Sequence, residues 1–434
     1  MAEEHEGRIV VVLRTHSQQD HIARILKGYD YAPIRGISHY CRNSYVRSSA
    51  FPYQLCRFLA GQGLCRCDYI AQFERASKAR VVSLLYSHLP NVFHQIVRRD
   101  DVVVLDEYHH VIEPEIIDVT ELWNKAEEEL GGKLVEPNPV GLEERGLKIW
   151  ASSGQSYSLE LSKLIRSGYH ELNGRKYAVI DYLSQIPEEN KLILISATPL
   201  PREVVSYDEA FEFEPKLEEV RLLVYKRFTF THRTRKDPRT VDMIRALLQA
   251  LSGFRTIAFL PSYESREIVR PQDLGYSEDP RELPTALVMG GKYAEGIDIN
   301  DSEVVLVIGI PYPDPFEEAT QIAQRWAKKK GIKGWQRKTA FIRAFQALGR
   351  GIRSPNARQV LILADRRYAD LRTFDLAPGW FRAIKAHGIE SLKVLREYLT
   401  RYWLFGASYA DEWLERREAW WRSVLLRRWS DRWG

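Results

Sequence analysis

Short and nearly continuous apolar runs are the feature that most constrains the fold of this chain. They lie at residues 8–19, 79–93, 102–110 and 191–200 in the first half, and at 255–262, 285–291, 303–313 and 359–368 in the second. Segments with helical periodicity, such as 21–28, 243–253 and 341–354, separate them. Strands that are apolar on both faces and alternate with helices are typical of parallel sheets that helices cover on both sides. We therefore expect an α/β fold with two such domains, joined between residues 200 and 220.

Length and composition exclude several classes of protein. A chain of 434 residues is too long for one hydrophobic core, so two or three domains are expected. No apolar run reaches the ~18 residues of a membrane span, and the polar N-terminus does not resemble a signal peptide. Four cysteines in such a chain argue against a disulfide framework, and a net charge of +5 suits a polyanionic partner only weakly. We expect a cytoplasmic protein without membrane association.

The apolar run at 102–105 ends on two acids, Asp106 and Glu107. Carboxylates at the carboxyl end of a hydrophobic strand are costly unless they hold a metal ion or activate a nucleophile. In nucleotide hydrolases the first acid after such a strand orders Mg²⁺ through water, and the second polarises the attacking water. Solvated acids at an ordinary strand end are the alternative.

Three further polar motifs follow apolar runs or lie on a helix. Ser196-Ala197-Thr198 ends the run at 191–200, and residues 290–298 follow a run in the second half. Gln346, Arg350 and Arg353 lie on a helical segment, where Gln346 and Arg350 share one face and Arg353 is adjacent. A glutamine and two guanidinium groups placed in this way are suited to reach phosphates across a cleft. An exposed arginine-rich helix would explain the last motif alone, but it does not explain the ordered set.

The ordered set resembles the motor of superfamily 2 helicases, and in particular the XPD-type helicases. LRTHSQQ (13–19) looks like the single-strand contact motif of that family, DEYH (106–109) like its DEAH box with Tyr108 in place of alanine, and SAT (196–198) like its coupling motif. The segments at 257–263, 291–298, 346–353 and 361–368 look like its second motor domain. The resemblance covers roughly residues 8–370 with gaps.

The resemblance implies two RecA-like motor domains that use ATP and Mg²⁺, and it assigns roles to individual residues. The catalytic set is Asp106, Glu107, His109, Gln346, Arg350 and Arg353, and the nucleotide-binding set is Glu295, Gly296 and Asp298. The coupling residues are Ser196, Ala197 and Thr198, and the DNA-binding residues are Arg14, Thr15, His16 and Ser17.

All four cysteines, Cys41, Cys56, Cys65 and Cys67, lie between the THS and DEYH motifs. Four thiolates can hold one [4Fe–4S] cluster or one Zn²⁺, and spacing alone does not decide between them. XPD-type helicases carry an iron–sulfur domain at this position, so the resemblance favours the cluster and leaves zinc as the alternative. The tight Cys65-Arg66-Cys67 spacing departs from the family pattern, in which the third and fourth ligands are far apart.

The motifs also predict domain boundaries. The first motor domain is expected at 1–36, 76–111 and 185–205, interrupted by the iron–sulfur insertion at 37–75 and a short, arch-like helical insertion at 112–184. The second motor domain is expected at 215–380, and a helical tail rich in tryptophan and arginine at 381–434. Aromatic residues at helical spacing usually pack onto a core, and this is the default interpretation of the tail. The more specific alternative is a basic, aromatic surface that binds nucleic acid or a partner.

One motif that the resemblance implies is missing. Helicase motors hold the β- and γ-phosphates of ATP in a loop of the pattern G-x-x-x-x-G-K-[ST], and no segment of the 434 residues has this pattern. In the family this loop precedes the THS strand, and here only seven residues precede that strand. We therefore expect an incomplete first motor domain with an unpaired strand edge. A second polypeptide, upstream residues or a rearranged domain would have to fill the gap.

Two hypotheses for function follow. The first is an ATP-dependent DNA helicase that moves five-prime to three-prime on single strands in DNA repair or processing, with a supplied phosphate loop. The second is a non-hydrolysing scaffold, derived from a helicase, that binds single-stranded or forked DNA, or one subunit of a split helicase. The retained acids support the first and the missing loop supports the second. A DNA substrate implies a nucleoid-associated protein, and only three methionines beside many arginines suggest a thermophilic archaeon.

Overall fold

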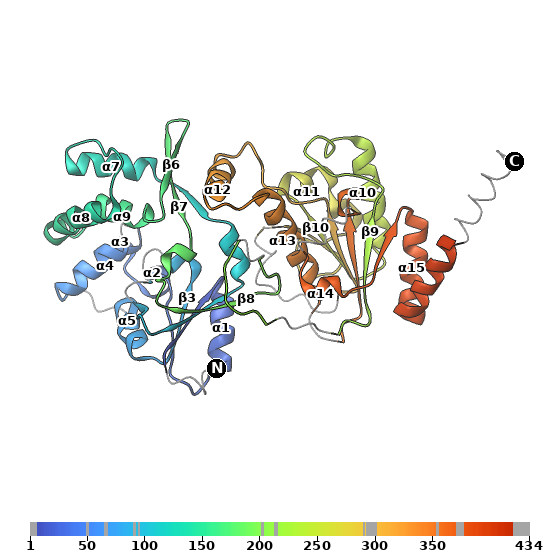
Figure 1. Cartoon of the computed structure of the whole chain (residues 1–434), viewed down its shortest axis with the longest axis horizontal. Coiled ribbons are helices and arrows are strands. Elements are labelled where there is room, and N and C mark those ends of the chain that lie inside the picture. The colour runs from blue at the N-terminus through green and yellow to red at the C-terminus, as the bar shows by residue number, and fades with distance from the viewer. Residues whose placement is uncertain are drawn as a thin grey trace. The chain divides into compact units, whose positions relative to one another are not determined.

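The computed structural model describes residues 7–48, 52–64, 68–89, 93, 96–200, 204–211, 216–289, 291, 302–352, 356–369 and 377–419. The chain divides into two units (Figure 1). The first comprises Met1–Val204 with Asp314–Trp335, and the second comprises Val205–Pro313 with Gln336–Gly434. Each unit is built around its own parallel sheet, as the apolar runs predict.

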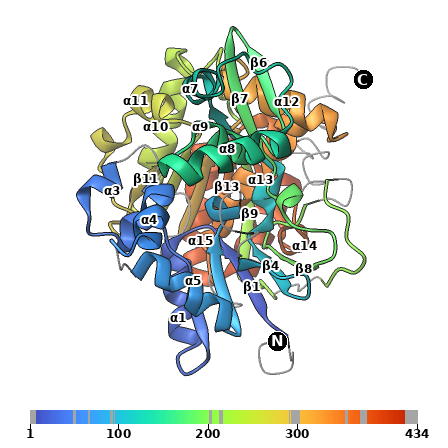
Figure 2. The same cartoon turned by 90° about the vertical axis from the view of Figure 1, so that its left-hand side faces the viewer.

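The first unit contains a five-stranded sheet of order β2-β3-β1-β4-β8, of which Figure 2 labels β1, β4 and β8. Its strands are β1 (Ile9–Leu13), β2 (Tyr31–Pro33), β3 (Val81–Leu85), β4 (Val102–Asp106) and β8 (Lys191–Ile195). Every described pairing in this sheet is parallel. Parallel strands all end at the same edge, so the residues that follow β1, β4 and β8 meet there.

Helix α1 (His16–Ile25) follows β1 directly, and the sequence already contains its start signal. Thr15 and Gln18 form a capping box, in which the Thr15 side chain accepts from the backbone of Gln18 and Gln18 Oε1 accepts from the backbone of Thr15. The cysteine-containing segment between β2 and β3 is helical. It folds into α2 (Ile37–Tyr40), α3 (Ser44–Ser48), α4 (Pro52–Gly61) and α5 (Asp68–Lys78).

The insertion between β4 and β8 is not purely helical, which corrects the sequence prediction for 112–184. It contains α7 (Thr120–Leu130), α8 (Pro139–Ser153) and α9 (Tyr157–Leu164), and also an antiparallel sheet of order β5-β7-β6. The strands are β5 (Glu115–Asp118), β6 (Tyr169–Leu172) and β7 (Arg175–Ile180). Asn173 and Gly174, with φ of 51° and 75°, connect β6 to β7. Asn-Gly with two positive φ angles is the strongest short hairpin signal, and the prediction overlooked it.

Helix α12 (Glu318–Lys329) belongs to the first unit, although its sequence lies inside the predicted second motor domain. Glu318 accepts hydrogen bonds from Tyr177 and, at 2.9 Å, from Asn173. Lys330 Nζ lies 2.6 Å from the buried Asp181 carboxylate. Side-chain contacts with the insertion sheet, rather than chain continuity, therefore place this segment in the first unit.

The second unit contains a six-stranded parallel sheet of order β11-β10-β12-β13-β9-β14. Its strands are β9 (Val220–Tyr225), β10 (Thr256–Leu260), β11 (Thr285–Val288), β12 (Val304–Ile308), β13 (Gln359–Ala364) and β14 (Ala386–Ile389). The helices around it are α10 (Pro238–Leu251), α11 (Tyr263–Val269), α13 (Trp335–Gly349), α14 (Gly379–Arg382) and α15 (Leu392–Phe405). β14 lies inside the predicted tail and adds a strand that the sequence reading did not identify.

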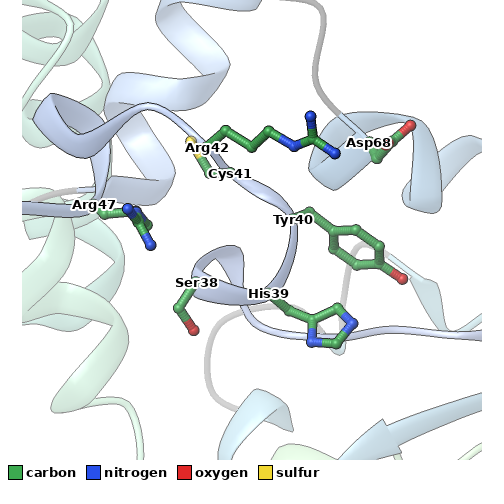
Figure 3. A pocket seen from close by; sticks show the side chains of 7 residues that line it. All are labelled: Ser38, His39, Tyr40, Cys41, Arg42, Arg47 and Asp68. Carbon is green, nitrogen blue, oxygen red and sulfur yellow. The ribbon is translucent and has the colours of Figure 1, made fainter.

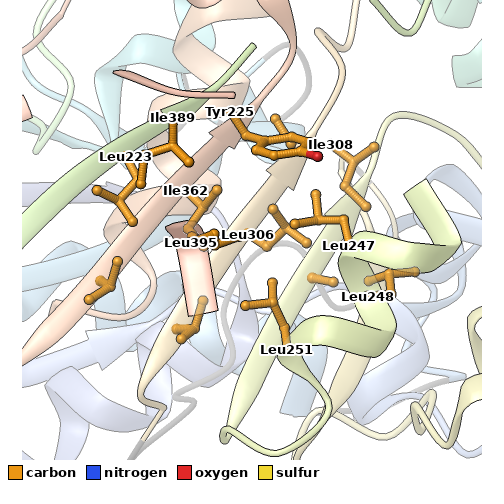
Figure 4. Packing of buried hydrophobic residues seen from close by; sticks show 14 of the residues in the cluster. Leu223, Tyr225, Leu247, Leu248, Leu251, Leu306, Ile308, Ile362, Ile389 and Leu395 are labelled. Atoms are coloured by element: carbon orange, nitrogen blue, oxygen red, sulfur yellow. The ribbon is translucent and has the colours of Figure 1, made fainter. Parts of the chain in front are cut away.

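Helices cover both faces of this second sheet. On one face, residues of α10 and α15 pack against alternate strand residues, and Figure 4 shows Leu247, Leu251 and Leu395 among them. On the other face, α13 contributes Phe341 and Phe345 to a second fully buried cluster. The sheet therefore has the two-sided core that continuous apolar strands require.

The end of the described chain is helical, as expected, with a further helix over residues 407–419. Two cations lie near the Trp413 ring, with the Arg401 guanidinium 4.3 Å and the Arg417 guanidinium 5.7 Å from its centroid. Trp403 and Trp413 both pack against the α10–α15 core cluster. Among the described residues, no helix is long and apolar enough to cross a membrane.

Candidate active site

Asp106 is the last residue of β4 and the centre of a small polar network. Gln18 Nε2 donates to Asp106 Oδ2 at 3.1 Å, and the Tyr86 hydroxyl donates to the Asp106 backbone oxygen at 2.9 Å. Burial, and then the neighbouring Glu107 carboxylate, raise the pKa of Asp106 to about 6. Burial and the Asp106 carboxylate also raise the pKa of Tyr86, so its hydroxyl stays a donor at neutral pH.

Glu107 begins a tight turn at the end of the strand. Its backbone is left-handed, with φ 54° and ψ 45°, a conformation that is uncommon for a residue with a long side chain. Such strained positions are concentrated at functional sites. The turn continues into η2 (Tyr108–Ile112), which buries His109 with 3% of its surface exposed.

His109 connects the DEYH turn to the SAT segment. Its Nδ1 lies 2.8 Å from Ser196 Oγ and 3.2 Å from Glu107 Oε2. Ser196 Oγ in turn accepts from the Thr198 backbone N–H at 3.0 Å. Direct contacts therefore connect Glu107 to Thr198 through His109 and Ser196.

A second link between the two segments comes from Tyr108, the residue that replaces alanine in the DEAH pattern. Its side chain is buried, and its hydroxyl oxygen accepts from the Leu200 backbone N–H at 2.9 Å. The substitution thus adds a hydrogen bond between the turn after β4 and the chain that leaves β8. A buried tyrosine needs such a polar partner, which explains why the larger residue is accommodated.

Gln18 is a site residue that the sequence reading did not single out. Its Oε1 accepts from the backbone N–H groups of Arg14 and Thr15, both at 3.0 Å, while its Nε2 donates to Asp106. The capping-box spacing of Thr15 and Gln18 is the sequence signal that could have indicated its position. The contact with Asp106 has no local signal, because the two residues lie 88 positions apart.

The four residues predicted to contact DNA lie at the turn from β1 into α1. Arg14, His16 and Ser17 are exposed or partly exposed there, and Thr15 is the helix cap. His16 Nδ1 lies 2.9 Å from the Oε1 atom of the buried Gln19. Their role in DNA binding stays a prediction.

The cysteine segment presents two buried thiols. Cys41 and Cys56 belong to one hydrophobic cluster with Val46 and Tyr69, and neither forms a disulfide. Cys65 and Cys67 lie outside the described residues. Within the described ranges no group of three or more potential ligands is found. Only half of the predicted ligand set can be placed, because the other two cysteines lie outside those ranges. Cys41 and Cys56 place two thiols in one cluster, half of the four that a zinc ion or a [4Fe–4S] cluster takes.

A pocket opens beside Cys41. Figure 3 shows its lining, which includes His39, Cys41, Arg42, Arg47 and Asp68. The mixture of charged side chains makes this a polar surface depression rather than an apolar ligand cavity.

In the second unit, two of the predicted phosphate-contacting residues can be placed. Gln346 and Arg350 lie near the end of α13, and both are half-buried. Arg353, Glu295, Gly296 and Asp298 lie outside the described residues.

Comparisons with known proteins agree with the motif order. Residues 275–384 match a family described as the helicase C-terminal domain. A regulator of telomere elongation helicase 1 homolog from Caenorhabditis briggsae is 31% identical over 121 residues, covering 25% of this chain and 12% of that protein. The ATP-dependent DNA helicase chl1 of Aspergillus clavatus is 27% identical over 173 residues, covering 34% of this chain and 23% of that protein. These alignments thus span less than a quarter of the curated relatives.

Solved structures extend the likeness to most of the chain. A structure named XPD helicase matches with a TM-score of 0.58 and 17% identity, covering 88% of this chain and 91% of that one. The Xpd4 protein of S. tokodaii matches with a TM-score of 0.52, 17% identity and the same coverage. The chain therefore contains a match to the helicase C-terminal domain, and its fold is similar to that of the two XPD structures. The α/β fold with two parallel sheets is shared with these structures.

Proposed function

We propose that the chain is the motor of an ATP-dependent DNA helicase that moves five-prime to three-prime along single-stranded DNA and acts in DNA repair or processing. The observation that carries this proposal is the contact chain from Asp106 and Glu107 through His109 to Ser196 and Thr198. Solvated acids at an ordinary strand end would not require a glutamate with a left-handed backbone conformation or a buried histidine.

Each residue of this network has a chemical role in the proposal. Mg²⁺, when bound with ATP, neutralises charge on the phosphates. Asp106 would hold that ion, and Gln18 orients the carboxylate by donating to Oδ2. Glu107 accepts a proton from the attacking water. His109 contacts both Glu107 and Ser196, and it passes the resulting change in the charge of Glu107 to Ser196. Gln346 and Arg350 would contact phosphates from the second motor domain.

The cysteines would hold an iron–sulfur cluster, with zinc as the alternative. Cys41 and Cys56, together with Cys65 and Cys67, supply four thiolates, which match either group. Such a group would hold the short helices α2 to α5 together, because few large apolar side chains are buried between them.

ATP hydrolysis measured with and without single-stranded DNA tests the proposal. Glu107→Gln keeps the size of the side chain but removes the base, so DNA-stimulated turnover should fall about 100-fold or more. Glu188→Gln, an exposed acid in the same unit, is the matched control and should leave turnover unchanged. Equal turnover in both variants would contradict the assigned role of Glu107.

A second candidate function is supported by the sequence itself. The 434 residues contain no G-x-x-x-x-G-K-[ST] loop, so a chain that binds DNA without hydrolysing ATP, or one subunit of a split helicase, is the alternative. Tight binding of single-stranded or forked DNA without turnover would favour it.

A further inference from the structure

Residues 314–335 belong to the first unit, although the chain on either side of them belongs to the second. Helix α12 lies within this segment and contacts the insertion through Glu318 and Lys330, as described above. The last residue of the segment, Trp335, makes a third contact. Its indole Nε1 donates to the backbone oxygen of Ile112 at 2.6 Å. The segment is therefore held to the first unit by side-chain contacts up to the residue at which the chain returns to the second.

The acceptor of this hydrogen bond lies in the turn that follows Asp106. Ile112 is the last residue of η2, which begins directly after Glu107 and contains the buried His109. The last carbonyl groups of a helical turn find no partner inside it, and Ile112 is fully buried. A buried carbonyl oxygen without a donor is costly, so the Trp335 indole satisfies a group that the turn itself leaves open. The contact thus ties Trp335 to the same turn that carries the candidate catalytic residues.

The donor is also the first residue of α13, the helix that leads to the other candidate phosphate contacts. Further along, α13 contributes Phe341 and Phe345 to the core of the second unit. Gln346 lies near the far end of the helix, roughly 16 Å from Trp335 along the axis at about 1.5 Å per residue, and Arg350 follows that end. Because a helix is stiff, a contact that fixes its first residue restricts where the side chains at its far end can lie.

Burial of a tryptophan ring does not by itself explain the hydrogen bond. Trp326, on α12, is 6% exposed and Trp335 is 5% exposed, so the two rings are buried to the same extent. Among the described residues, the indole nitrogen of Trp326 has no hydrogen-bond partner. The two tryptophans therefore differ in the donor contact and not in burial, which makes Trp326 a matched control for Trp335.

We propose that Trp335 is a positioning residue for ATP hydrolysis. Its indole N–H fixes the first residue of α13 to the turn after Asp106, so that the helix presents Gln346 and Arg350 to the nucleotide phosphates in a set geometry. This inference rests on the proposed function, and it assigns a role to a residue that lies outside every motif of the sequence.

Two substitutions separate the donor from the volume of the ring. Trp335→Phe removes the N–H and keeps much of the ring, whereas Trp335→His loses more volume but can place an N–H at the corresponding ring position. Trp326→Phe is the control. DNA-stimulated ATP hydrolysis gives kcat and the KM for ATP, and amide hydrogen exchange is followed without nucleotide in η2 and in the first bonded turn of α13, residues 108–113 and 339–343.

We expect kcat of Trp335→Phe to fall about tenfold or more while KM stays within about twofold, because the contact acts on geometry in the transition state. Trp335→His should lose less than Trp335→Phe. Exchange should be faster in both segments of Trp335→Phe and unchanged in the rest of the first sheet. Trp326→Phe should leave kcat and the exchange of both segments as they are in the unchanged chain.

A larger loss of kcat in Trp335→His than in Trp335→Phe, or equal losses in Trp335→Phe and Trp326→Phe, assigns the effect to packing and overturns the proposal. Exchange that stays the same in both segments of Trp335→Phe, or rises throughout the first sheet, overturns it too. If the unchanged chain hydrolyses no ATP, the proposed function is refuted, and the exchange pattern alone decides whether the indole fixes α13. If Trp335→Phe does not fold, 3-benzothienylalanine at position 335, with sulfur in place of the N–H, should give the result expected of Trp335→Phe.

Discussion

Replacing Asp106 with asparagine is expected to stabilise the folded chain at neutral pH while it abolishes the proposed activity. Asp106 is partly buried, and burial together with Glu107 raises its pKa from 3.8 to about 6. The folded state therefore binds the proton of this carboxyl group more tightly than the unfolded state does. The ionised carboxylate is destabilising, and asparagine removes that charge without changing the size of the side chain.

The size of the stabilisation by Asp106→Asn and its dependence on pH both follow from the raised pKa of Asp106. Each pKa unit corresponds to 1.36 kcal/mol, so a rise from 3.8 to about 6 amounts to about 3 kcal/mol. Because the carboxyl group is partly exposed, solvent screening reduces this to roughly 1–2 kcal/mol. With a raised folded-state pKa, the stability of the unchanged chain falls as pH rises from about 4 to about 6 and then stays level. The advantage of Asp106→Asn should therefore be absent near pH 4, grow up to about pH 6 and remain constant above it.

Urea unfolding of the unchanged chain and of Asp106→Asn, followed at several pH values between 4.5 and 8, measures this difference. Glu107→Gln provides an internal control, because removing the neighbouring charge should lower the pKa of Asp106 and shrink the effect. A variant less stable than the unchanged chain at pH 8, or a stability difference independent of pH, would refute the reasoning.

Three further predictions concern residues outside the acid pair. Gln18→Ala removes the side-chain half of the capping box and the donor to Asp106, and it should cost about 1–2 kcal/mol of unfolding free energy, measured in urea. Asp411→Ala leaves Arg221 buried without its 2.7 Å partner and should cost about 3–5 kcal/mol, measured as a fall in the thermal midpoint of the second unit. Cys41→Ala and Cys56→Ala should each lower the bound iron, or zinc, of the purified protein, as elemental analysis would measure.

Matched controls separate these effects from general damage. Ser17→Ala changes an exposed residue in the first turn of the same helix as Gln18, and Glu412→Ala removes an exposed acid next to Asp411. Both should leave stability within about 0.5 kcal/mol of the unchanged chain. A stability loss in Ser17→Ala equal to that of Gln18→Ala would argue against a specific cap, and retention of all metal in both cysteine variants would exclude these thiols as ligands.

The position of the acid pair could be predicted from the sequence because it depends on local pattern. The apolar runs ending at Asp106 and Ile195 are continuous enough to require buried parallel strands, and parallel strands end at one edge. Asp106 and Ser196 therefore had to lie near that edge. The helix cap at Thr15 is equally local. The hairpin at Asn173 also had a local signal, the Asn-Gly pair, which the sequence prediction overlooked.

Other features were decided by the tertiary structure, since they depend on strand order and on packing between distant segments. The hydrogen bond from Gln18 to Asp106 exists because β1 and β4 are neighbours in the sheet, which no pattern near residue 18 indicates. Helix α12 joins the first unit because Glu318 and Lys330 find partners there. The sequence by itself determined two α/β domains, because apolar periodicity is local. Only the tertiary structure placed β8 at an open edge, because the neighbours of a strand are set by the whole sheet and not by its own residues.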